Sequence, residues 1–144
     1  MFNKKAKILL VEDDLPTIEI YEEVFRKAGF EIETVKNGSE ARNKLREFRE
    51  PKVREGKEEK PDLILLDLLI PGLENGTSLL KEIKEDAQTK DIPLFVLTNY
   101  PDLKLGKKLL SQGVDKFLLK TDYTPRQLVQ MVKEFLQGLD PSFL

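Results

Sequence analysis

Five side chains that can do chemistry stand at the ends of apolar segments of the chain. Glu12 and Asp13 follow the first segment and Asp67 ends another, while Thr98 ends a third and Lys120 follows a fourth. Clustered carboxylates repel one another unless a cation neutralises them. Mg²⁺ suits such a cluster because it binds to one or two carboxylates and keeps several waters. Together these residue types predict a magnesium site in which a lysine and a hydroxyl hold phosphate oxygens.

Composition restricts the chemistry further. The chain of 144 residues contains no cysteine and no histidine, which excludes disulfides, thiolate nucleophiles, zinc–sulfur sites and a phosphohistidine within this chain. A net charge of −2 gives no overall attraction to nucleic acid, so we expect no direct contact with it. The apolar stretches are too short to span a bilayer and no signal peptide is recognisable, which predicts a cytoplasmic protein without membrane contact.

Five strand segments alternate with helical patterns, at residues 7–11, 31–35, 62–67, 93–98 and 116–119. The first, third and fourth are apolar throughout, as strands of a parallel sheet are when helices cover both of its faces. The second alternates polar and apolar residues, which indicates an edge strand. The sequence therefore predicts an α/β fold of the flavodoxin-like kind, a doubly wound five-stranded parallel sheet in the order 2-1-3-4-5 with five helices.

Turn and capping residues delimit the helices. Asp14 is a candidate N-cap ahead of Pro16, and Gly29 ends the first helical pattern. Further helices are expected after residues 37–38, over 76–86 and 102–112, and after a capping box that begins at Thr124. The charged segment 50–60 is interpreted as an insertion, either a solvated loop or an extension of the second helix, and 138–144 as a short tail. We expect one domain over residues 1–144.

The topology brings the reactive residues to one place. In an open parallel sheet, ligands bind at the carboxyl ends of the strands, next to the switch between the first and third strands. A central aspartate there is a candidate nucleophile that forms an acyl phosphate. Spacing alone does not decide which aspartate it is, and Asp67 is favoured because it ends the central strand. Each residue also has a simpler explanation, such as a capped turn or a solvated charge, so the hypothesis depends on their shared position.

Four segments resemble the receiver domains of two-component response regulators, including the single-domain chemotaxis type. They read KILLVEDD, PDLILLDLLIPG, PLFVLT and GVDKFLLK, and the resemblance extends from residue 7 to about residue 137. It implies that Asp67 is the phosphoacceptor and that Glu12 and Asp13 hold Mg²⁺ together with Asp67 and the backbone carbonyl of Leu69.

The resemblance also implies roles for the remaining site residues. Lys120 would bind a phosphoryl oxygen, Thr98 would be the switch hydroxyl, and the ring of Phe117 would swing inward in the active state. The donor would be a phosphohistidine on a sensor histidine kinase or a phosphotransfer protein. The fourth helix, fifth strand and fifth helix would form the face that signals to a downstream protein or to a second copy of the chain.

Such a protein catalyses its own phosphorylation and slow autodephosphorylation and is not a metabolic enzyme. The main alternative is a receiver-like interaction module that is not phosphorylated. A flavodoxin-like redox protein would need a phosphate-cradling loop where Glu12, Asp13 and Asp14 stand. An aspartyl-phosphate hydrolase would typically carry a second aspartate at the position of Leu69.

Four residues depart from the pattern of the family. Thr121 follows Lys120 where proline is usual, so the cis bond expected there is in doubt. Asn99 replaces a small residue, which narrows access to the acceptor. Leu69 and Tyr100 would flank the path of the hydrolytic water without an acid or amide to orient it. The last two predict a long-lived phosphoryl group.

Overall fold

A computed structural model describes residues 5–49, 60–68, 77–99 and 102–139 of the chain. The strands are β1 (Lys7–Val11), β2 (Glu31–Val35), β3 (Leu63–Asp67), β4 (Leu94–Thr98) and β5 (Lys116–Leu119). The helices are α1 (Leu15–Lys27), α2 (Gly38–Arg49), α3 (Thr77–Glu85), α4 (Leu103–Ser111) and α5 (Pro125–Leu136), with a short 3₁₀ helix, η1 (Lys120–Asp122), after β5.

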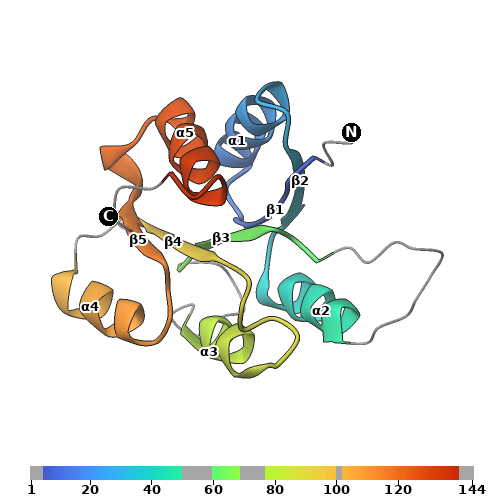
Figure 1. The fold of residues 1–144 in the computed structure, drawn as a ribbon, viewed down its shortest axis with the longest axis vertical. Coiled ribbons are helices and arrows are strands. Elements are labelled where there is room, and N and C mark those ends of the chain that lie inside the picture. The colour runs from blue at the N-terminus through green and yellow to red at the C-terminus, as the bar shows by residue number, and fades with distance from the viewer. Residues whose placement is uncertain (1–4, 50–59, 69–76, 100–101, 140–144) are drawn as a thin grey trace.

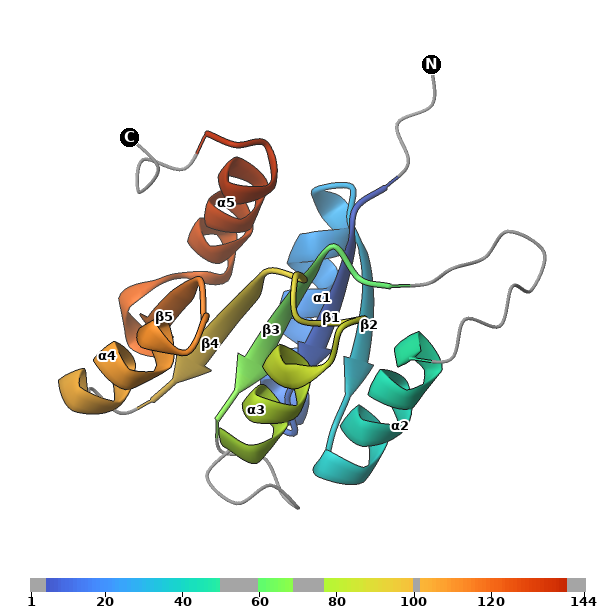
Figure 2. The same ribbon diagram turned by 60° about the horizontal axis from the view of Figure 1, so that its bottom comes forward.

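The strands form one parallel sheet in the order β2-β1-β3-β4-β5. Helices α1 and α5 cover one face of the sheet, and α2, α3 and α4 cover the other (Figure 1). All strand arrows run in the same direction, so their carboxyl ends lie at one edge of the molecule (Figure 2). The predicted fold class and strand order are confirmed.

Apolar side chains fill both sides of the sheet. Along β1, Leu9 and Val11 belong to the core beneath α2, α3 and α4, whereas Ile8 and Leu10 belong to the core beneath α1 and α5. All five residues of β3 and of β4 are buried. The continuous apolar runs in the sequence therefore reflect burial on two faces, which holds the strand ends in fixed positions.

Capping residues begin and end the helices as the sequence indicates. The carboxylate of Asp14 accepts a hydrogen bond from the backbone N–H of Thr17 at 3.1 Å, and Gly29 follows α1 with φ of 93°. Thr124 and Gln127 form the predicted capping box of α5. These local bonds satisfy backbone groups that a helix leaves unpaired at its ends.

Small differences from the predicted elements have local causes. The third strand begins at Leu63; before it, the Asp62 carboxylate accepts from the Lys7 N–H at 2.7 Å and the Asp62 N–H donates to the Lys7 carbonyl at 2.7 Å. The fourth begins at Leu94, whose N–H donates to the Asp115 carboxylate at 2.8 Å. The sequence analysis missed η1. No cis peptide bond occurs among the described residues. The bond between Lys120 and Thr121 lies within them and is therefore trans.

Two predicted segments fall mostly beyond what the structure describes. Residues 50–59 of the charged segment and residues 140–144 of the tail lie outside the described residues. Within the described ranges, no helix is both long enough and apolar enough to span a bilayer.

Candidate functional site

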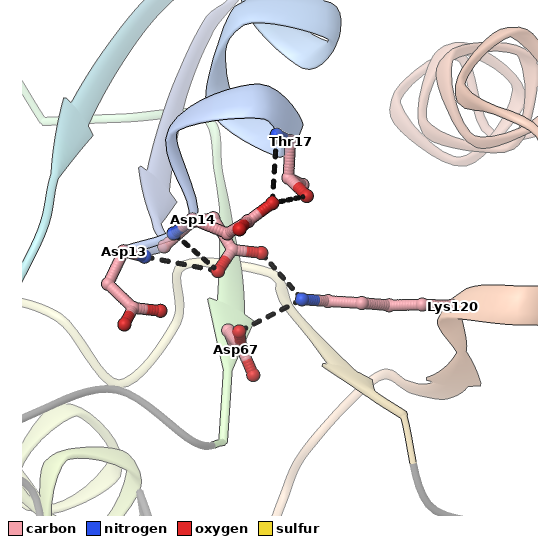
Figure 3. Close-up of polar contacts among 6 residues, drawn as sticks. Asp13, Asp14, Thr17, Asp67 and Lys120 are labelled. Atoms are coloured by element: carbon pink, nitrogen blue, oxygen red, sulfur yellow. Dashed lines mark hydrogen bonds and ion pairs between the residues drawn. The ribbon is translucent and has the colours of Figure 1, made fainter.

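Reactive side chains meet at the carboxyl end of the sheet. Glu12 and Asp13 follow β1, Asp67 ends β3 and Lys120 follows β5. Their backbones are placed by strand pairing, since Val11 is opposite Leu66 and the next residues of both strands are acidic. The close-up view shows the side chains of Asp13, Asp67 and Lys120 gathered at this end, beside the start of α1 (Figure 3).

Lys120 connects two of the carboxylates. Its ammonium Nζ donates to Glu12 Oε1 at 2.6 Å and to Asp67 Oδ2 at 2.9 Å. The three side chains are 13%, 1% and 8% exposed, for Lys120, Glu12 and Asp67 respectively. Burial opposes the charge of Lys120, but the hydrogen bonds to Glu12 and Asp67 outweigh burial and raise its pKa above the ordinary value. Lys120 is therefore held as a cation between two acidic groups.

Glu12 is the most deeply buried acidic group of the site. Its second oxygen, Oε2, accepts from the backbone N–H of Asp13 at 3.0 Å. Burial raises the pKa of Glu12 from 4.5 to about 7, and contact with Asp67 adds to the effect while Lys120 opposes it. A buried carboxylate beside a second carboxylate favours its neutral form unless more positive charge is supplied.

A hard metal ion fits this arrangement. One oxygen each from Glu12, Asp13 and Asp67 lie within 4.8 Å of one another. The Asp13 side chain is exposed and makes no hydrogen bond or ion pair to any residue that the structure describes. The cluster thus has three carboxylates and one ammonium, which contacts two of them, so its net negative charge favours a divalent cation bound by oxygen. The donor set is of the kind that Mg²⁺ prefers.

Asp14 has a different part in the structure. Its carboxylate accepts from both the backbone N–H and the hydroxyl of Thr17, so it caps α1. These hydrogen bonds lower its pKa. The sequence predicts Asp14 as an N-cap, and the structure confirms this.

Thr98 and Phe117 lie on the neighbouring strands. Thr98 is buried at the end of β4, opposite Leu119 of β5. Phe117 is partly buried and packs against the core between the sheet and α4. It is paired with Val96, which lies two residues before Thr98 on β4. Asn99 is exposed, whereas Leu69 and Tyr100 lie outside the described residues.

Tyr21 is a residue near the site that the sequence analysis placed only in the core. It is 7% exposed on α1. Burial raises its pKa, and the charges of Lys120, Glu12 and Asp67 also act on it. Its spacing along α1 indicates a buried position. No sequence signal distinguishes a core tyrosine near a charged cluster from any other core tyrosine.

Curated relatives align with nearly the whole of this chain at about 30% identity. The profile of the response regulator receiver domain matches residues 8–133. The DNA-binding response regulator MtrA of Mycobacterium tuberculosis (strain ATCC 25618 / H37Rv) is 31% identical over 97% of this chain and 54% of its own length. The phosphate regulon transcriptional regulatory protein PhoB of Escherichia coli (strain K12) is 30% identical over 94% of this chain and 53% of its own length. The chain thus spans about half the length of these relatives.

Solved structures give the same result. The phosphorylated cyanobacterial phytochrome response regulator RcpA is 30% identical with a TM-score of 0.75, over 94% of this chain and 96% of that one. The signal receiver domain of a signal transduction histidine kinase from Syntrophus aciditrophicus is 29% identical with a TM-score of 0.73, over 94% of this chain and 93% of that one. Fold, sequence profile and relatives agree, and the chain belongs to the response regulator receiver domain family.

Proposed function

We propose that this protein accepts a phosphoryl group on Asp67 and signals through the resulting change of conformation. The observation that carries the proposal is the Lys120 ammonium, which binds Asp67 at 2.9 Å and Glu12 at 2.6 Å beside the exposed carboxylate of Asp13. A nucleophilic carboxylate, a fixed cation and a set of metal ligands are thereby combined at one open end of the sheet.

The transfer would proceed by substitution at phosphorus. A carboxylate oxygen of Asp67 forms a bond to the phosphorus atom while the bond from phosphorus to the donor nitrogen breaks, and the donor imidazole leaves. Asp67 is then an acyl phosphate. Lys120 has the charge and the reach to bind an oxygen of the transferred group, because it already contacts Asp67. Phosphoryl transfer depends mainly on such positioning and charge stabilisation.

Glu12 and Asp13 would hold Mg²⁺ together with Asp67. The family also supplies a backbone carbonyl at the position of Leu69, which lies outside the described residues. The bound ion would offset the negative charge of the carboxylates and of the phosphoryl oxygens. The chain itself supplies the ligands, excludes water from Glu12 by burial and keeps Lys120 charged.

The donor would be a phosphohistidine of a sensor histidine kinase or of a phosphotransfer protein, which is consistent with the absence of histidine from this chain. Thr98 and Phe117 would transmit the change to α4, β5 and α5. Lys104, Lys107 and Lys108 are exposed on α4 and would give this face a positive charge toward a downstream protein or a second copy. Cytoplasmic location belongs to the same proposal.

Intact-mass measurement after incubation with acetyl phosphate and Mg²⁺ tests the proposal. We expect wild type to gain the mass of one phosphoryl group, and we expect no gain in Asp67→Asn or in wild type with EDTA. Asp62→Asn is the matched control, because Asp62 lies at the amino end of the same sheet and binds Lys7.

Two results would contradict the proposal. Failure of folded wild type to gain mass would favour the unphosphorylated interaction module instead. A gain retained in Asp67→Asn would move the acceptor to another residue. The phosphorylated state described for RcpA supports the expected outcome through its 30% identity to this chain.

A further inference from the structure

Gly106 lies buried in α4 against the ring of Phe117. A β-carbon on Gly106 would stand 2.9 Å from Cδ2 of Phe117, 3.2 Å from Cε2 and 3.4 Å from Cγ. These separations are shorter than the usual contact between carbon atoms, which is about 3.5–4.0 Å. A larger residue at position 106 and the ring in its present place are therefore incompatible.

The backbone of α4 does not itself call for glycine. The described glycines with positive φ are Gly29, Gly113 and Gly138, and Gly106 is not among them. Its N–H donates to the carbonyl of Asp102 at 2.9 Å, as an ordinary helical residue does. Glycine is a poor helix former, so the feature that this position serves is the close approach of the ring.

The ring connects this contact to the candidate site. Phe117 is opposite Val96 in the pairing of β5 with β4, and Leu119 is opposite Thr98. Val96 and Thr98 project from the same face of β4, because side chains alternate along a strand. Val96 and Phe117 both pack in the core beneath α4. The ring thus lies between α4 and the sheet, on the face from which Thr98 projects.

We propose that Gly106 is a positioning residue that gives the Phe117 ring its place against α4. It thereby sets the balance between this arrangement and the one that follows phosphorylation. The second statement rests on the proposed function, in which Thr98 and Phe117 transmit the change. Alanine at position 106 displaces the ring from its present place, so it changes the balance between the two arrangements.

The first experiment needs neither metal nor phosphate. Para-fluorophenylalanine is placed at position 117 and its fluorine NMR resonance is compared between wild type, Gly106→Ala and Ser111→Ala. Ser111 is the matched control because it lies on the exposed side of the same helix. We expect the resonance to shift in Gly106→Ala and to stay in place in Ser111→Ala. An unchanged resonance in Gly106→Ala would overturn the proposal.

The second experiment measures the coupling to the site. Beryllofluoride with Mg²⁺ mimics the phosphoryl group, and we expect Gly106→Ala to change the affinity for it by about fivefold or more, which corresponds to the lower end of the strain that overpacking causes. The change should vanish when Phe117→Ala is also present, since the added β-carbon then has no ring to displace. An unchanged affinity in Gly106→Ala, or an equal change in both backgrounds, would contradict the role of the ring.

Two further outcomes are informative. If wild type does not bind beryllofluoride, the proposed function fails, and the fluorine resonance alone then decides the role of Gly106. If Gly106→Ala does not fold, recovery of folding in the Gly106→Ala/Phe117→Ala protein supports the proposal. Continued failure of the double variant to fold contradicts it.

Discussion

Lys120 dominates the chemistry of the site at the scale of single residues. Its ammonium is the cation that contacts both buried carboxylates among the described residues. A charge removed from such a pair leaves its partners buried without compensation, and this costs more than the pair itself contributes. Lys120 therefore has a structural role in the metal-free protein in addition to its proposed role at the phosphoryl group.

Replacement of Lys120 by methionine should separate these roles. At about pH 8 in EDTA we expect Lys120→Met to lose about 3 kcal/mol of unfolding free energy, because Glu12 and Asp67 stay buried and lose the cation that they share. Mg²⁺ should recover part of this loss, whereas phosphorylation by acetyl phosphate should remain slow. Urea denaturation with and without Mg²⁺ measures both effects. The exposed Lys104→Met should change neither property, and a stable Lys120→Met protein in EDTA would contradict the structural role.

Glu12 makes the stability of the metal-free protein depend on pH. Its pKa is raised by burial from 4.5 to about 7, so the folded state binds the proton more tightly than the unfolded state does. The stabilisation is fully present below pH 4.5 and is lost as pH rises through about 7. In EDTA, denaturation between about pH 5 and about pH 8 should therefore show falling stability.

Glu12→Gln provides the control for this pH dependence. The amide does not titrate, so the variant should lose the Glu12 part of the slope between these pH values. Wild type should also bind Mg²⁺ more tightly as pH rises through about 7, because the metal requires the carboxylate form. A slope that is identical in both proteins would show that another group is responsible.

At the scale of the elements, the N-cap of α1 fixes where this helix begins beside the site. α1 begins directly after the acidic triplet, and Asp14 fixes its first turn by accepting from Thr17. The cap and the proposed metal ligands are thus adjacent in the chain but distinct in role. Asp is a common residue both at helix N-caps and at metal sites, so Pro16 after Asp14 was the local sign that marked the third acid as the cap.

Two substitutions at Asp14 test this separation. Asp14→Ser keeps a capping oxygen and should leave the melting temperature nearly unchanged, whereas Asp14→Ala should lower it. Both variants should bind Mg²⁺ within about twofold of wild type if the metal ligands are Glu12, Asp13 and Asp67. Isothermal titration measures the Mg²⁺ affinity, and thermal melts measure the melting temperature. A tenfold loss of Mg²⁺ affinity in Asp14→Ser would make Asp14 a ligand.

Strands were predictable where the local sequence pattern was clear. β1, β2 and β5 match the expected ranges because apolar runs and alternation mark them clearly. The first residues of β3 and β4 were not predictable, since Asp62 and Asp115 reach across the sheet to backbone groups far away in sequence. η1 was missed because residues 120–122 carry no helical periodicity.

The whole molecule supports the site from two cores. Leu65 belongs to the core beneath α1 and α5, and Leu66 to the core beneath α2, α3 and α4. Both residues are fully buried immediately before Asp67. The position of the acceptor therefore depends on packing from both sides of the sheet.

Leu66→Ala should lower the unfolding free energy by about 2–5 kcal/mol, because it leaves a cavity in a closely packed core. Leu110→Ala is the control, because that side chain is 47% exposed and its loss should cost no more than about 0.5 kcal/mol. Urea denaturation compares them. Equal losses in the two variants would mean that the core around β3 is loosely packed.

The candidate site was predictable as a set of residues but not as a geometry. The carboxyl ends of parallel strands lie at the same edge of a sheet, which brought Glu12, Asp67 and Lys120 into one hypothesis. The double contact of Lys120 and the close approach of Gly106 to Phe117 depend on side-chain packing between distant segments. Neither leaves a pattern in the local sequence.

The pairing of Glu12 with Lys120 joins residues that are 108 positions apart in the chain. Contacts between such distant positions form late, because the intervening chain must first be ordered. During synthesis on the ribosome, the lysine becomes available only after β1 to β5 have emerged. A nascent or truncated chain would therefore carry Asp67 without its cation, and under the proposed function it would not accept a phosphoryl group until the last strand of the sheet is in place.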